Sequence, residues 1–184
     1  MLIYQPAEDS YLLSETVSKH LSNKSKNIKI LDMGSGSGIQ AQTCKKLGFN
    51  NILVADINPD AISHLKSLNL NVVQTDLFSN INKNEKVDLI IFNPPYLPED
   101  KREPEDSKLA TTAGKQGYEI IIKFLKQAKQ HLNKNSAILL LFSSLSKPDI
   151  IKQESEKLGY KYKQLNLKKI AFEQLYVYLF ELKS

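Results

Sequence analysis

The stretch Leu31-Asp32-Met33-Gly34-Ser35-Gly36-Ser37-Gly38 joins an apolar segment, 27–33, to a segment of helical character, 39–47. Glycine has no Cβ, so glycines at alternate positions let the backbone turn sharply and approach a ligand closely. The dinucleotide-binding fingerprint would place its third glycine at position 39, which is Ile39, and no Gly-Lys-Ser/Thr phosphate-binding sequence follows. Strand, glycine turn and helix in this order predict a ligand-binding α/β unit, although tight-turn glycines also occur without a ligand.

Strand-like and helix-like segments alternate around this unit. The patterns predict strands at 27–33, 52–55, 71–74, 87–92 and 137–142, and helices at 10–21, 39–47, 59–68, 117–132 and 147–158. Asp9 or Ser10 is expected to cap the first helix. Two last strands, 160–167 and 175–182, have no helical pattern between them. We therefore expect a Rossmann-like, three-layer α/β sandwich on a seven-stranded, mostly parallel sheet with a C-terminal antiparallel hairpin.

The composition is that of a globular protein, with 184 residues, 41% hydrophobic and 24% charged, which predicts one domain over 1–184. The single cysteine, Cys44, excludes an internal disulfide framework, and no Cys/His cluster has metal-ligand spacing. No signal peptide is apparent, and no apolar run approaches the roughly 20 residues that span a bilayer. The net charge of +5 is dispersed, as on solvated helix faces. We expect a cytoplasmic protein without a metal or a membrane partner.

Acidic residues follow three successive predicted strands around the glycine loop. Asp56 ends the second strand, where a carboxylate can accept hydrogen bonds from both hydroxyls of a ribose. Asp76 follows the third strand and could meet an adenine amino group, and Asp32 could face an amino-acid ammonium. Each of them alone could equally be a helix N-cap or a loop carboxylate. Together they fit an adenosine that carries an amino acid, which describes S-adenosylmethionine.

The sequence Asn93-Pro94-Pro95-Tyr96 directly follows the apolar, β-branched run 87–92. The two prolines end this strand, because neither can donate a hydrogen bond to the sheet and each restricts its own φ. An Asn side chain and adjoining carbonyls are then held at a strand's carboxyl end, where open α/β sheets bind ligands. The side-chain and backbone carbonyls are both acceptors and suit a planar NH2 group. This pattern indicates chemistry on an amide or amino nitrogen.

With these motifs in place, the chain resembles class I methyltransferases, and within them the HemK/PrmC group that methylates a glutamine side-chain nitrogen of translation release factors. The likeness is to the short archaeal and eukaryotic branch and covers nearly the whole chain. Asn-Pro-Pro-Tyr is shared with adenine and cytosine amino-methyltransferases and specifies the reaction class, whereas the first stretch below is more typical of this branch. The motifs that carry the resemblance are 4–10 (Tyr-Gln-Pro-Ala-Glu-Asp-Ser), 32–38, 56–59, 75–77 and 93–96.

The resemblance implies two sets of site residues. The catalytic set would be Asn93, Pro94, Pro95 and Tyr96, in which Asn93 and the carbonyl of Pro94 hold the substrate amide and Tyr96 flanks it. The set that binds S-adenosylmethionine would be Ser10, Asp32, Gly34, Gly36, Gly38, Asp56, Ile57, Asp76, Leu77 and Asn93.

The chemistry agrees with these assignments. A carboxamide nitrogen is a poor nucleophile, because its lone pair is delocalised into the carbonyl. Two acceptors that hold its NH2 protons orient the nitrogen towards the methyl group, so positioning lowers much of the barrier. No side chain near the motif in sequence is an obvious strong base, and we expect the proton to leave later to water.

The sequence departs from the family's pattern at one point. The family carries two adjacent glycines within a Gly-Gly-x-x-Gly stretch after the catalytic loop, and here Ala113 replaces one of them. Gly114, Gly117 and Glu119 still match. This replacement leaves the geometry of the loop open.

Two substrate classes remain open from the residues themselves, a protein glutamine and an amino group of RNA or DNA. The segment 97–108 is net acidic and would repel a phosphate backbone if it lies beside the pocket, although it could also be a solvated lid. The chain also has little spare length for holding a flipped base. These features favour the glutamine. A third alternative, a binding subunit without turnover, is disfavoured by the intact Asn-Pro-Pro-Tyr motif and cofactor loop.

The family branch implies two protein partners. One is a class 1 release factor, presented through its Gly-Gly-Gln loop, and the other is a small zinc-binding activator that shields an apolar surface near the cofactor. The short strand 71–74 gives weak support to the activator, because we expect it at a sheet edge and edges invite pairing.

Overall fold

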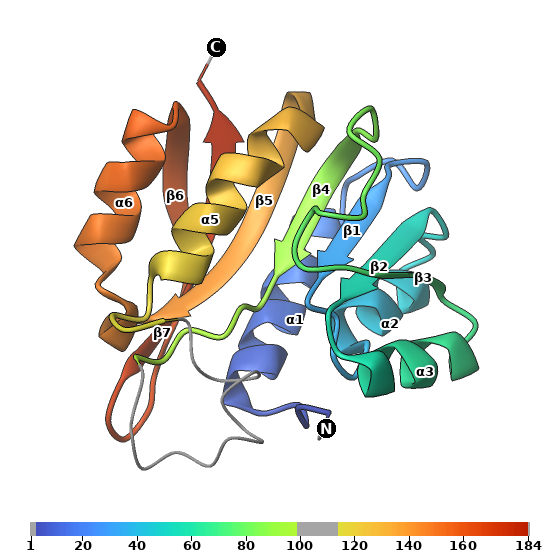
Figure 1. Ribbon diagram of the computed structural model, residues 1–184, viewed down its shortest axis with the longest axis horizontal. Helices are drawn as coiled ribbons and strands as arrows, with labels where there is room; N and C mark the ends of the chain where they lie inside the picture. The colour runs from blue at the N-terminus through green and yellow to red at the C-terminus, as the bar shows by residue number, and fades with distance from the viewer. Residues whose placement is uncertain (1–2, 99–113, 184) are drawn as a thin grey trace.

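The computed structural model describes residues 3–98 and 114–183, which form a seven-stranded sheet with helices on both faces (Figure 1). The strands lie in the order β3-β2-β1-β4-β5-β7-β6. All pairs from β3 to β5 are parallel, whereas β7 is antiparallel to both β5 and β6. The predicted sheet with its C-terminal hairpin is confirmed. The strands are β1 (Ile30–Met33), β2 (Ile52–Asp56), β3 (Asn71–Gln74), β4 (Val87–Phe92), β5 (Leu132–Ser143), β6 (Tyr160–Lys169) and β7 (Gln174–Leu182).

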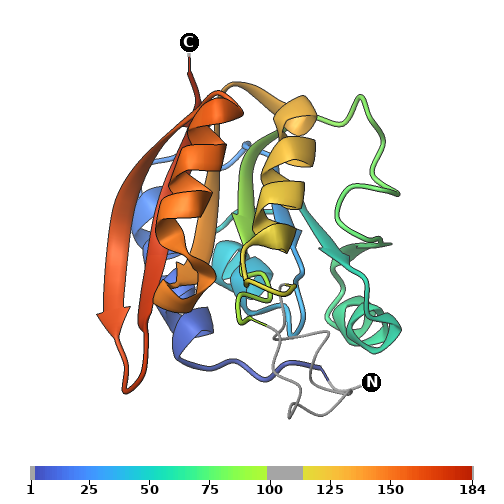
Figure 2. The same cartoon turned by 60° about the vertical axis from the view of Figure 1, so that its left-hand side comes forward.

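Two apolar cores separate the three layers (Figures 1 and 2). One face of the sheet packs on α1 (Glu8–Leu21), α2 (Ile39–Lys46) and α3 (Pro59–Ser67). The other face packs on α5 (Glu119–Ala128) and α6 (Pro148–Lys157). Successive β5 residues enter opposite cores, Ile138 with the α5 side and Leu139 with the α1 side. Burial on both faces explains why the central strands read as continuous apolar runs.

Element boundaries differ from the predictions where polar residues continue an element. The helix expected over 117–132 ends at Ala128, and a 3-10 turn, η1 (Lys129–His131), leads into β5. β5 begins at Leu132 rather than at 137, because its pairing with β4 shifts register and leaves the polar residues 133–135 exposed. The first strand begins at Ile30 rather than at 27. No helix within the described ranges has the length and apolar character needed to cross a membrane.

The start of α1 corrects a second expectation. Ala7, not Asp9 or Ser10, occupies the N-cap position, and no side chain caps the helix. Asp9 and Ser10 lie in the first turn and are both buried. The Asp9 carboxylate accepts from Ser10 N within this turn and also from the Tyr4 hydroxyl, so it makes its contacts from inside the helix and not from the N-cap position.

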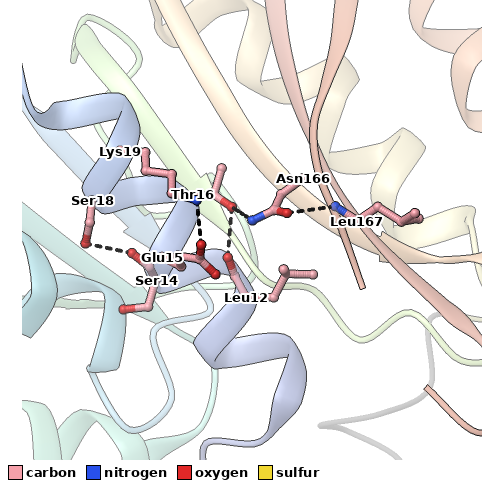
Figure 3. Close-up of polar contacts among 8 residues, drawn as sticks. All are labelled: Leu12, Ser14, Glu15, Thr16, Ser18, Lys19, Asn166 and Leu167. Carbon is pink, nitrogen blue, oxygen red and sulfur yellow. Dashed lines mark hydrogen bonds and ion pairs between the residues drawn. The ribbon is translucent and has the colours of Figure 1, made fainter. Parts of the chain in front are cut away.

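A β-bulge fastens the C-terminal hairpin to α1 (Figure 3). The pairing of β6 with β7 shifts register between Gln164 and Asn166, so that one extra residue enters β6. Asn166 Nδ2 then donates to Thr16 Oγ1 at 3.1 Å, and Thr16 Oγ1 donates to the Leu12 carbonyl at 2.8 Å. Lys168 and Glu8 form an ion pair nearby. These contacts set the hairpin beside the beginning of α1.

Gly38 sits where the glycine loop enters α2. Its φ is +78°, and a Cβ at this position would lie 2.9 Å from Cδ2 of Leu65, which is fully buried in α3. The loop is also tied to the sheet, because Ser35 Oγ donates to the Asp32 carbonyl at 2.6 Å and Ser35 N donates to the Ala55 carbonyl at 3.0 Å. Packing of α3 therefore requires glycine at this place.

We expect Gly38→Ala to lower the free energy of unfolding by about 2–3 kcal/mol, because backbone strain adds to overpacking against Leu65. Gly48→Ala is the matched control, since Gly48 has a φ of +89° but no atom within 4 Å of its would-be Cβ. Backbone strain alone should cost the control about 1 kcal/mol. Urea unfolding followed by circular dichroism measures both, because the chain has no tryptophan. Equal losses in the two variants would contradict this account of Gly38.

Candidate functional site

Three of the predicted polar residues lie at one edge of the sheet. β1 pairs in parallel with β2 on one side and with β4 on the other, so the carboxyl ends of the three strands lie together. Asp32, Asp56 and Asn93 stand at these ends. After β1 the chain continues to β2 and β3 on one side, and after β4 it continues to β5 on the other side. The carboxyl ends of β1 and β4 therefore form a topological switch point. Open α/β sheets bind their ligands at such points.

The Asp56 carboxylate organises the glycine loop. Its Oδ2 accepts from Gly36 N at 2.8 Å and its Oδ1 accepts from Asn58 N at 2.8 Å, while Asp56 remains only 8% exposed. Each carboxylate oxygen keeps a further lone pair. The neighbouring Ile57 is 46% exposed and presents apolar surface beside the carboxylate. A ligand with hydroxyl donors and an apolar ring could contact both residues.

Asp32 is a buried carboxyl group at the end of β1. It is 1% exposed, and its Oδ2 accepts from Ala41 N in the first turn of α2 at 3.1 Å. Burial raises the pKa of Asp32 to about 7, with a smaller contribution from the charge of Asp56, while the hydrogen bond from Ala41 opposes the shift. A cation beside Asp32 would favour its ionised form. The site is thus suited to a positively charged ligand group.

The beginning of α1 reaches the same edge through Ser10. Gln40 Nε2 on α2 donates to the Ser10 carbonyl at 2.9 Å. Gln40 Oε1 is buried and has no hydrogen-bond partner among residues 3–98 and 114–183. Gln40 was not among the predicted site residues, because an isolated glutamine in a helical pattern carries no signal of its own.

The Asn93 side chain is held by Asp9. Asn93 Nδ2 donates to Asp9 Oδ2 at 3.0 Å, and Tyr4 Oη donates to the same carboxylate, 3.1 Å from each oxygen. This contact orients the amide, so that Asn93 Oδ1 is left as the outward acceptor. Asn93 Oδ1 is buried and lacks a partner in the part of the chain that the structure describes. A buried acceptor without a donor is costly and is expected where a ligand supplies the donor.

Tyr96 is fixed by backbone contacts from two later segments. Ser146 Oγ, in the 3-10 turn η2 (Ser144–Ser146), donates to the Tyr96 carbonyl at 2.8 Å. A Cβ on Gly117 would lie 2.9 Å from the same carbonyl oxygen, so this position needs glycine. Glu119 supports the turn, since its carboxylate accepts from Gln116 N at 3.0 Å. Burial, and then the charges of Asp9 and Glu173, raise the pKa of the Tyr96 hydroxyl.

Asp76 and Leu77, which are expected to contact the cofactor, lie on the α5 side of the sheet. The Asp76 carboxylate pairs with Lys123 Nζ of α5 at 2.9 Å, and both side chains are about half exposed. Leu77 has a φ of +48° and is buried in the core under α5. The sequence could not reveal this pairing, because Lys123 follows Asp76 by 47 positions. The acidic segment over 99–108 and Ala113 lie outside the described residues.

Two carboxylates near Asn93 were not assigned from sequence. Asp9 was quoted within the N-terminal motif, but its contact with Asn93 joins positions 84 apart. Glu173 comes from the tip of the C-terminal hairpin, and its Oε2 is a buried oxygen without a partner among the described residues. Only the folding of α1 and of the β6–β7 hairpin towards β4 could identify them.

The residues at this edge fit S-adenosylmethionine. Asp56 offers acceptors to the hydroxyls of a ribose, and Asp32 offers a titratable carboxyl group to an ammonium. The positive φ angles of Gly34 and Gly36 bring backbone close to the space between these carboxylates. Asn93 Oδ1 adds an acceptor for a separate NH2 group.

Comparison with known proteins agrees with this geometry. Residues 9–163 match the family described as the methyltransferase small domain. A Methanocaldococcus jannaschii protein that is named a putative protein N5-glutamine methyltransferase is 36% identical, over 95% of this chain and 89% of the relative. The human methyltransferase HEMK2 is 27% identical, over 81% of this chain and 75% of its own length.

A solved structure shares the whole fold. It is the E. cuniculi Mtq2–Trm112 complex, described as responsible for methylation of the termination factor eRF1, and it superposes with a TM-score of 0.79. The identity is 27%, and the match covers 98% of each chain. The chain therefore belongs to the methyltransferase small domain family, and it is an enzyme that transfers a methyl group from S-adenosylmethionine.

Proposed function

We propose that this enzyme methylates the side-chain amide nitrogen of a glutamine, in the Gly-Gly-Gln motif of a class 1 translation release factor. The observation that carries the proposal is the buried Oδ1 of Asn93, an acceptor to which no residue of 3–98 or 114–183 donates a hydrogen bond. A glutamine amide supplies such a donor on a planar nitrogen. The named activities of the M. jannaschii and E. cuniculi relatives support glutamine as the source of that nitrogen. An enzyme that modifies release factors would act where translation takes place, so we propose a cytoplasmic location.

The acceptor residues act by holding the amide in one orientation. Asp9 fixes the Asn93 side chain, so that Oδ1 points to the substrate. Asn93 Oδ1 and the Pro94 carbonyl would each accept one amide N–H, while Tyr96 flanks the group. S-adenosylmethionine supplies an electrophilic methyl group when it is bound. Holding a weak nucleophile in line with this group lowers the barrier by several kcal/mol or more on an order-of-magnitude scale.

The cofactor residues divide the ligand among them. Asp56 would accept from the ribose hydroxyls and Asp32 would face the ammonium. Asp76 would turn from Lys123 to the adenine amino group, and a half-exposed ion pair costs only about 0–1 kcal/mol to break. The other proposed contacts surround these carboxylates and are Ser10, Gly34, Gly36, Gly38, Ile57, Leu77 and Asn93.

We also propose that a small protein partner covers the β3 edge. β3 is an outer strand of the sheet, and its ends, Asn71 and Gln74, are exposed. The exposed Ile57 follows the adjacent strand β2 and adds apolar surface. An unpaired strand edge beside an apolar side chain invites a partner. The solved E. cuniculi relative, which is a complex with Trm112, supports a second protein in this role. The resemblance described above implies that this protein is a small zinc-binding activator.

Labelled S-adenosylmethionine should transfer its methyl group to a release factor, and mass spectrometry should locate it on the glutamine of the Gly-Gly-Gln motif. Ribosomal RNA is the competing substrate in a parallel reaction. Label on RNA alone would refute the glutamine assignment and favour an amino-methyltransferase of nucleic acid.

Asn93→Ala should reduce turnover at least about 100-fold, because one of two positioning acceptors is lost. Calorimetry should find cofactor affinity within about threefold of the wild type, since Asp32 and Asp56 remain. Asn133→Ala, on the exposed start of β5, is the matched control and should leave both values unchanged. Undiminished turnover in Asn93→Ala would overturn its role.

Asp32→Asn should remove a pH dependence of stability. The raised pKa means that Asp32 contributes stability below its ordinary value near 4, and that this contribution is lost as pH rises through about 7. Without cofactor, the wild type should therefore lose free energy of unfolding relative to Asp32→Asn between pH 5 and 8, by at most about 1.4 kcal/mol per pH unit. Urea unfolding at several pH values measures the difference. Parallel pH curves for the two proteins would contradict the buried, neutral carboxyl.

If a partner covers the edge of β3, co-expression with a Trm112-type protein should change both the elution of the chain and its affinity for the cofactor. The heterodimer should elute as one species in size-exclusion chromatography and bind cofactor more tightly than the isolated chain. An isolated chain that stays monodisperse and binds cofactor at full strength alone would make the partner unnecessary. Lys substitution at Val72, on β3, should weaken the heterodimer.

A further inference from the structure

The β6–β7 hairpin brings one carboxylate, Glu173, to the Asn-Pro-Pro-Tyr motif. Ile170 N donates to the Glu173 carbonyl at 3.0 Å and closes the hairpin turn. The next residue is held by η2, because Gln174 N donates to Ser144 Oγ at 3.0 Å. The same 3-10 turn holds Tyr96 through Ser146 Oγ. Glu173 and Tyr96 are thus anchored to opposite ends of one three-residue turn.

Glu173 lies close enough to Tyr96 and Tyr4 for its charge to act on their hydroxyls. The charge of Glu173 contributes to the raised pKa of Tyr96 and to that of Tyr4, after the larger contributions of burial and of Asp9. Glu173 Oε2 is buried, and no described residue donates a hydrogen bond to it. A carboxylate oxygen removed from water without a donor is costly. Like Asn93 Oδ1, this oxygen is therefore suited to a donor that the substrate brings.

The other titratable groups around Asn93 are poor proton acceptors. Tyr4 and Tyr96 keep their protons, because burial and the nearby carboxylates raise the pKa of both hydroxyls. Asp9 is already occupied by donors, namely the Tyr4 hydroxyl, Asn93 Nδ2 and Ser10 N.

The charged residues of the hairpin do not neutralise Glu173. Lys168 is paired with Glu8, and Lys169 lies on β6 opposite Gln174 without a described ion pair. Of the carboxylates gathered at the motif, Glu173 alone keeps a buried oxygen with no donor among the described residues.

We propose that Glu173 shares with the Pro94 carbonyl the second N–H of the substrate amide, the one that Asn93 Oδ1 does not hold, and takes this proton during methyl transfer. The inference rests on the proposed function and adds a base to it. The amide nitrogen forms a bond to the methyl carbon while the bond from that carbon to sulfur breaks, so the positive charge of the sulfonium passes to the amide. The N–H proton then moves to the Glu173 carboxylate, and from there to water.

A carboxylate is a strong enough base for this step because the proton leaves only as the new N–C bond forms. An uncharged amide is far too weak an acid to protonate a carboxylate, whereas an N-alkylated amide cation is a much stronger acid than a carboxylic acid. Proton transfer is therefore favourable only as the new bond forms. Acid–base catalysis of this kind contributes about 10²–10⁴ in rate.

Glu173→Gln tests the step, because it keeps the size and an acceptor oxygen but removes the base. We expect kcat to fall about 100-fold or more, with KM for the release factor within about threefold of the wild type. Glu173→Asp should recover part of the loss. Glu181→Gln is the matched control, since Glu181 lies near the far end of β7, the strand that follows Glu173, in a surface pair with Lys161. It should change kcat by less than about twofold.

Two further readouts separate a base from a structural role. The acidic limb of the pH dependence of kcat, where the carboxylate is protonated, should be present in the wild type and absent in Glu173→Gln. Calorimetry with S-adenosylhomocysteine and a glutamine peptide should find equal peptide affinity in both proteins. Retention of more than a third of the wild-type kcat, or an unchanged pH profile, would overturn the proposal.

The position of the methyl group distinguishes this result from failure of the proposed function. If the wild type methylates an RNA amino group and no glutamine, the proposed function fails. The ratio of Glu173→Gln to wild-type turnover is then measured on that RNA, where the nitrogen must also lose a proton. A normal rate for the variant on the substrate that the wild type accepts would overturn the role of Glu173 in either case.

Discussion

Parallel pairing of β1 with both β2 and β4 is the constraint on which the rest of the site depends. Strands that run in the same direction end at the same edge, so Asp32, Asp56 and Asn93 meet there. Helices pack on both faces of the sheet, and Asp32, one residue before the end of β1, is 1% exposed. The buried Asp32 carboxyl, with its raised pKa, is a direct result.

The N-terminal helix α1 supplies contacts that hold site residues at this edge of the sheet. Asp9 enters from α1 and holds the amide of Asn93, while Gln40 ties the Ser10 carbonyl to α2. Helix α1 is in turn held by the C-terminal hairpin, through the contact of Asn166 with Thr16 (Figure 3) and through the ion pair between Lys168 and Glu8. Residues near both ends of the described chain therefore hold the part of the site around Asn93.

Two of the buried acceptors without a described donor lie at or near the Asn-Pro-Pro-Tyr motif. Asn93 Oδ1 and Glu173 Oε2 lack hydrogen-bond partners in residues 3–98 and 114–183, although buried polar atoms are rarely left so. Asn93 Oδ1 is orientated by Asp9, and Glu173 is carried by a hairpin turn fastened to η2. An NH2 group satisfies both kinds of acceptor, with one proton held in place and one released. In this proposal, the same group of residues positions the substrate nitrogen and accepts its proton.

The sequence by itself predicted the seven-stranded sheet, the glycine loop and the residues at the strand ends. These features are local, because hydrophobic periodicity, glycine and proline act within a few positions of the chain. The boundaries that it missed, at α1 and β5, are places where polar residues continue an element for reasons of packing and pairing.

The contacts of the side chains were decided only by the tertiary structure. Three contacts join residues that are distant in the chain. They are the hydrogen bond between Asp9 and Asn93, the ion pair between Asp76 and Lys123, and the electrostatic effect of Glu173 on Tyr96. Motif spacing carries no information about such pairs, because the folding of α1, α5 and the hairpin against the sheet sets their distances. The sequence thus indicated chemistry on an amide or amino nitrogen, and the fold determined which side chain orients Asn93 and which carboxylate comes near Tyr96.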